Sequence, residues 1–175
     1  MCRRIVPRIA AVWCCGAALG GCSGMPLMTQ PIASYGESNA FAPAGYSQTK
    51  VDDTHYQVRA TGTEATPRQR VEKIARARAA QIGVEEKLKY FKVASVQHAV
   101  KCSKRQAGYK SQDALPASRP TVVLDVVYAK DWADPSFTDA AAAFDALSSE
   151  IAGEIVGAEA KTLAAQEIRA SCGQS

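Results

Sequence analysis

The sequence contains no apolar run long enough to form a permanent transmembrane helix. Its longest run covers residues 9–19, whereas a helix needs about 20 apolar residues to span a bilayer. Three arginines precede this run, and the small residues Gly20, Gly21 and Cys22 follow it. A basic start, a short apolar run and a small-residue exit are typical of a secretory signal peptide. We therefore interpret residues 1–21 as a signal peptide.

The chain also has little excess charge. The formal net charge is +4, but residues 1–21 hold three of the 21 basic residues and none of the 17 acidic ones. The remainder thus carries 18 basic residues against 17 acidic ones. Nucleic-acid-binding proteins concentrate basic residues on one face, so the charge balance predicts that nucleic acid is not a partner.

Familiar catalytic motifs are missing: the sequence has no G-x-S-x-G, H-E-x-x-H, P-loop or C-x-x-C. Its only histidines are His55 and His98, and both fall in segments with strand-like alternation. Paired strands could bring them together around a metal with Asp52 or Asp53, but solvent-facing strand positions are the better interpretation. Pairing of His98 with a Cys102 thiolate is likewise less favoured than a disulfide. We expect no catalytic residue, no metal and no cofactor, and predict that the protein is not an enzyme.

The tetrapeptide Leu19-Gly20-Gly21-Cys22 resembles the lipobox of bacterial lipoproteins. The resemblance implies that the Cys22 thiol is diacylated, that the chain is cut just before it, and that the new amino terminus is acylated. Two or more acyl chains form a stable membrane anchor. Because residue 23 is Ser and not Asp, the resemblance further implies the outer membrane, with the domain in the periplasm. The alternative is an ordinary cleaved signal peptide with a cysteine there by chance.

Two cysteines, Cys102 and Cys172, keep free thiols after removal of the signal peptide and acylation of Cys22. Thiol pairs tend to close in an oxidising compartment. Each of the two follows a predicted element, so we expect a disulfide between them. The competing outcome is that Cys172, close to the terminus, pairs with another molecule.

Residues 22–44 have no helical or strand periodicity and are interrupted by Pro and Gly, which predicts a flexible, lipidated tether. Its reach is about 60 Å if fully extended. The domain then covers residues 45–175.

Alternating apolar residues predict strands over 55–61, 91–101 and 120–129. The last is apolar on both faces, so we place it centrally in the sheet. A helix is predicted from Pro67 to Lys87 with Thr66 as its N-cap. A second helix is predicted from Thr138 as its cap, with an apolar stripe that runs through Ile155 to residue 158. This order indicates an α+β fold: a small, mainly antiparallel sheet covered by helices on one face.

Arg78 interrupts the apolar stripe of the first predicted helix. An arginine in such a place either reaches past the edge of the sheet or pairs with a buried acid. Asp125 is the only acid within the most apolar predicted strand. We therefore predict a structural ion pair between Arg78 and Asp125, with an active site as the less favoured alternative.

A basic segment follows the second predicted strand. It contains Lys101, Lys104, Arg105 and Lys110, which could contact lipid headgroups or lipopolysaccharide phosphates. A solvated loop is the simpler interpretation.

Between residues 45 and 91 the sequence resembles a family of small, uncharacterised lipoproteins of Gram-negative bacteria. The matching segments are Gly45-Tyr46-Ser47, residues 56–62, Arg78-Ala79-Ala80 and Tyr90-Phe91. Three positions depart from the family pattern: Ala60 replaces an aromatic residue, Gln81 replaces Glu, and Lys87 replaces a Gly that ends the helix in a left-handed conformation. The resemblance implies a location and a fold class but no reaction.

These patterns together predict an outer-membrane lipoprotein that acts non-enzymatically, through contacts with an unidentified envelope protein or an anionic envelope component. One alternative is a binding module that holds an anionic ligand with the basic segment 101–110. A small periplasmic enzyme is a third possibility, which an open cleft holding Asp125 and His98 would favour.

Overall fold

The alternating segments form a five-stranded sheet in the computed structural model, which describes residues 31–102, 118–132 and 134–173. The strands lie in the spatial order β1 (Gly45–Lys50), β2 (His55–Thr61), β4 (Arg119–Ala129), β3 (Tyr90–Lys101) and β5 (Thr138–Asp139). Every neighbouring pair is antiparallel, and β4 is central as predicted. The short strands β1 and β5 were not predicted.

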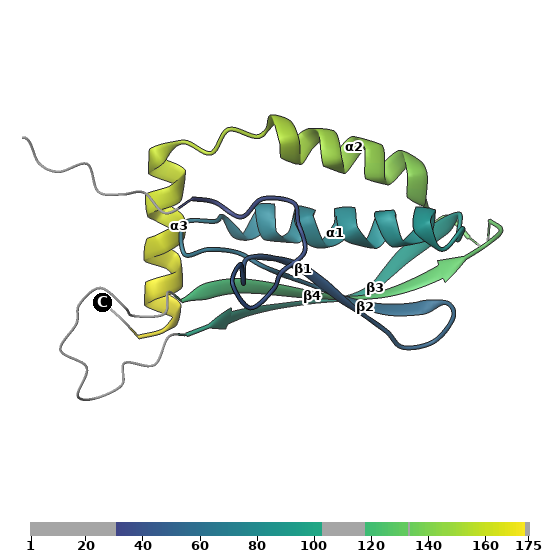
Figure 1. Cartoon of the computed structure of the whole chain (residues 1–175), viewed down its shortest axis with the longest axis horizontal. Coiled ribbons are helices and arrows are strands. Elements are labelled where there is room, and N and C mark those ends of the chain that lie inside the picture. The colour runs from purple at the N-terminus through teal and green to yellow at the C-terminus, as the bar shows by residue number, and fades with distance from the viewer. Residues whose placement is uncertain (1–30, 103–117, 133, 174–175) are drawn as a thin grey trace, which may run out of the picture.

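Three helices complete the fold. α1 (Arg68–Glu85) lies directly on one face of the sheet, and α2 (Ala140–Gly153) packs on α1 (Figure 1). α3 (Ala158–Ser171) crosses one end of the domain. The predicted α+β fold with helices on one face is confirmed. In the described part of the chain, no helix has both the length and the hydropathy that a membrane span requires.

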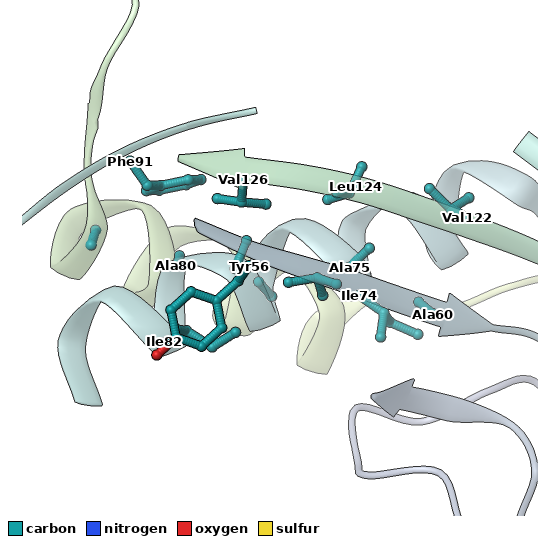
Figure 2. Close-up of a cluster of buried hydrophobic side chains, with 14 of the residues drawn as sticks. Tyr56, Ala60, Ile74, Ala75, Ala80, Ile82, Phe91, Val122, Leu124 and Val126 are labelled. Carbon is teal, nitrogen blue, oxygen red and sulfur yellow. The ribbon is translucent and has the colours of Figure 1, made fainter. Parts of the chain in front are cut away.

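The hydrophobic core lies between the sheet and α1. Alternate residues of β2 and β4 point toward the helix because side chains on a strand alternate between its two faces. Figure 2 shows these side chains meeting Ile74 and Ile82 of α1. The fully buried members include Val58, Val71, Ile74, Leu124 and Val126.

Residues 31–38 pack against the domain, so the prediction of a flexible tether is wrong for this segment, whereas residues 39–43 are exposed. Ala33 is 2% exposed; its N–H donates to the Thr66 hydroxyl (2.9 Å) and its carbonyl accepts from Arg70 Nε (3.0 Å). The Tyr35 hydroxyl donates to Gln81 Oε1 (2.5 Å). Side chains of α1 and of the turn before it thus hold a segment that has no periodicity of its own.

The C-terminal helix predicted as one element is two helices. α2 ends at Gly153, α3 begins at Ala158, and Ile155 between them is 94% exposed. Asp139, not Thr138, caps α2, because its carboxylate accepts from the N–H of Ala142 (2.9 Å). The predicted apolar stripe therefore stops at the buried Ile151.

Thr66 does not cap α1, contrary to prediction. The helix has no side-chain cap. The Thr66 hydroxyl accepts instead from the N–H groups of Thr63 (3.0 Å) and Ala33 (2.9 Å). Thr66 therefore fixes the turn before α1 and the N-terminal segment.

Candidate interaction surface beside β3

Arg78 is buried, as predicted, but its partner is not Asp125. The guanidinium donates from Nη1 to Glu85 Oε1 (2.9 Å) and from Nε to Gln48 Oε1 (3.1 Å). It also lies 5.1 Å from the ring centroid of Tyr46. Glu85 is seven residues further along the same helix, so no contact across the sheet is needed.

Asp125 lies on the sheet face opposite α1, which explains why it cannot reach Arg78. It accepts from the Ser95 hydroxyl (2.6 Å) and, more weakly, from Gln57 Nε2 (3.4 Å). These two residues lie opposite Asp125 on the neighbouring strands β3 and β2. The hydrogen bond from Ser95 lowers the pKa of the Asp125 carboxyl below its ordinary value. The three side chains form a polar contact across the sheet that favours the ionised form of the carboxyl.

The two histidines do not meet. His55 lies opposite Val127 and His98 lies opposite Val122, at different positions and on different faces of β4. Asp52 accepts from Thr54, and Asp53 pairs with Lys50. Among the described residues no group of three His, Cys, Asp or Glu side chains is placed to hold a metal. The predicted alternative of a shared metal is thus not assembled.

His98 and Asp125 are also on opposite faces of the sheet, because Val122 faces α1 and Asp125 does not. The His98 imidazole lies 3.6 Å from the Glu72 carboxylate instead. The arrangement that would have favoured an enzyme is therefore not formed.

Cys102 and Cys172 form the predicted disulfide, with their Cα atoms 5.5 Å apart. The bond joins the end of β3 to the residue after α3.

Lys101, the first residue of the predicted basic segment, is exposed at the end of β3. Lys104, Arg105 and Lys110 lie outside the described residues, as does the predicted lipid-attachment residue Cys22.

A groove of about 350 Å³ lies between α2 and β3. Its apolar lining comes from β3 and α2, and its charged lining residues in the described part of the chain are Arg76 and Lys92. Arg76 binds Glu72 of the same helix (2.7 Å), and the Lys92 ammonium lies 4.9 Å from the Phe137 ring centroid. The groove is lined by Arg76, Phe91, Lys92, Val93, Val96, Ser136, Thr138, Ala143 and Leu147.

The sequence did not predict this groove, because a β-bulge changes the alternation of β3. The register shifts between Val93 and Ser95. Val93 lies opposite Val126 and Val96 lies opposite Leu124, so both face the helices. Strict alternation would place Val93 and Val96 on different faces.

No protein-family model, curated protein or solved structure matches this chain.

Proposed function

We propose that the protein is a lipid-anchored outer-membrane lipoprotein that acts without catalysis, through contacts of its periplasmic domain with other envelope components. The observation that carries the proposal is the tetrapeptide Leu19-Gly20-Gly21-Cys22 directly after a short apolar run. The Cys102–Cys172 disulfide supports it, because such bonds persist in oxidising compartments such as the periplasm.

The folded N-terminal segment limits how far the domain can stand from its anchor. Pro31, the first residue that the structure describes, already contacts the domain, because its carbonyl accepts from the Thr63 hydroxyl (2.8 Å). The chain from Cys22 to Pro31 reaches about 30 Å at most when fully extended. This is half the reach expected from the sequence alone, so the lipoprotein acts close to the membrane surface.

Metabolic labelling with a fatty acid tests the anchor. The wild type should take up label and fractionate with outer membranes. The Cys22→Ser variant should take up none and remain as precursor or soluble protein. Cys15→Ser, which changes another cysteine of the signal peptide, is the matched control and should be labelled like the wild type. Absence of label on the wild type would overturn the proposal.

A further inference from the structure

The outer edge of β3 is largely unpaired in the described structure. β3 has 12 residues, and β5 pairs only with Tyr90 and Phe91. The remaining backbone, residues 92–101, has no outer strand partner among the described residues. An open strand edge presents N–H and C=O groups that can pair with another chain. Residues 90–101 contain no proline, so every residue keeps its N–H group.

Next to this edge, the groove offers a place for side chains of an added strand. Its apolar lining includes Val93, Val96 and Leu147, and Val96 is 37% exposed. In strand addition, backbone hydrogen bonds supply affinity and pockets for alternate side chains supply specificity. The unpaired edge of β3 and the apolar groove, which would supply these two contributions, lie next to each other.

Charge indicates what kind of strand fits. Arg76 and Lys92 are the charged lining residues of the groove, and Lys101 is exposed at the far end of β3. Because Arg76 is already paired with Glu72, acidic side chains on an added strand would meet Lys92 and Lys101, which both lie on the face of β3 away from α1. Complementary charge favours the correct partner and register.

We propose that the β3 edge binds an extended acidic segment of a partner protein, which adds a strand beside residues 92–101 and places an apolar side chain in the groove. The proposal rests on the proposed function for the compartment in which the partner is met. It goes beyond that function by naming the contact surface and the chemistry of the partner.

A second copy of this chain fits less well. Two β3 strands paired antiparallel about Gln97, with the bulge residue Ala94 of each copy left unpaired, would place Lys92 of each copy opposite Lys101 of the other. Like charges directly opposite each other on paired strands are destabilising. An acidic segment removes this repulsion.

Binding of a defined peptide tests the proposal. The probe is a short labelled peptide in which valine and glutamate alternate, and its binding to the mature full-length protein in detergent is followed by fluorescence anisotropy. Val96→Glu should weaken binding about tenfold or more, because it places a negative charge in the groove. Val51→Glu is the matched control: Val51 is exposed in the turn after β1, and binding should stay within about twofold.

Two control peptides separate the contributions of charge and backbone. Replacing each glutamate with lysine should abolish binding, and replacing the central valine with proline should weaken it, because proline has no N–H to donate. Hydrogen exchange should show amides of β3 protected by the glutamate peptide and not by the lysine peptide.

The proposal is overturned if no peptide binds, if all bind alike, or if Val51→Glu and Val96→Glu act equally. It is also overturned if the protein forms a dimer that Val96→Glu dissociates, because the edge would then belong to a second copy. Cys22→Ser should bind the peptide like the wild type, so failure of peptide binding and failure of lipidation are separate results.

Discussion

Arg70 of α1 binds Glu154, the residue after α2, with 2.7 Å between Nη1 and Oε2. The Arg70 side chain is 6% exposed. It also donates to the carbonyls of Ala33 (3.0 Å) and Ile151 (3.2 Å). One guanidinium therefore joins the N-terminal segment, α1 and the end of α2.

Arg70→Ala should destabilise the protein by about 3 kcal/mol, because it leaves the carbonyls of Ala33 and Ile151 without their donor. Glu154 then keeps only its longer contact with Lys73 (3.5 Å). The matched control is Arg76→Ala. Arg76 lies on the same helix, but its side chain is 40% exposed and its partner Glu72 lies within the same helix. The control should cost about 1 kcal/mol or less. Urea denaturation measures the free energy of unfolding of both variants. Equal losses of stability would show that the contacts of Arg70 with other segments do not stabilise the fold.

The partner of Arg78 can be established by double-mutant cycles. The coupling free energy between Arg78→Met and Glu85→Gln should be about 0.5–1 kcal/mol. We expect a value in the lower part of the range for contacting residues because the Glu85 side chain is 47% exposed to solvent. The cycle with Asp125→Asn should be additive within about 0.5 kcal/mol. A larger coupling with Asp125 than with Glu85 would contradict the observed pairing.

Lys87 ends α1 in the left-handed conformation, with φ of 57°. The N–H of Leu88 donates to the Gly83 carbonyl (2.8 Å) and that of Lys87 to the Val84 carbonyl (3.3 Å), which is the Schellman pattern. The left-handed region costs a non-glycine residue about 1–2 kcal/mol. Part of that is offset by the greater entropy of glycine in the unfolded chain.

Lys87→Gly should therefore raise the free energy of unfolding by about 0.5–1 kcal/mol. Glu86→Gly, one residue earlier at φ of −87°, removes no strain and should lower it. Thermal and urea denaturation distinguish the two variants. A destabilised Lys87→Gly would show that the lysine side chain contributes more than the backbone strain costs.

Asp125 should make stability depend on pH in the acid range. Its pKa is lowered in the folded protein, first by the Ser95 hydrogen bond, so the folded state favours the ionised form. The resulting stabilisation is complete well above the ordinary value of 3.8 and is lost as pH falls through the lower folded pKa.

The difference in stability between wild type and Asp125→Asn should accordingly be largest near neutral pH and shrink in acid. Ser95→Ala removes the main hydrogen-bond donor to Asp125. The loss of stability between neutral and acidic pH should therefore also be smaller in this variant than in the wild type. Denaturation at a series of pH values measures this effect. Parallel profiles for wild type and Asp125→Asn would contradict it.

Local patterns predicted the parts of the fold in which one face is buried. Strands 55–61 and 120–129 alternate over a buried core, and β4 was placed centrally because it is apolar on both faces. The disulfide followed from the count of cysteines expected to keep free thiols if the chain is exported. These features could be predicted because they depend on the alternation of apolar residues or on the number of cysteines, and both can be read directly from the sequence.

The missed features depend on contacts distant in the chain. β1 has weak alternation and is held by pairing with β2. Ala33 and Tyr35 in the N-terminal segment are held by hydrogen bonds with Arg70, Thr66 and Gln81. The bulge at residues 93–95 reverses the alternation that would have revealed the groove. None of these leaves a local periodic signal.

The central claim is that Cys22 carries the membrane anchor of the mature protein. The most direct measurement is mass spectrometry of the N-terminal peptide from protein isolated from the cell envelope. The account predicts a peptide that begins at Cys22 and carries a diacylglyceryl group on sulfur and an acyl chain on its amino group. A peptide that begins elsewhere, or a Cys22 thiol that is free to be alkylated, would contradict the account.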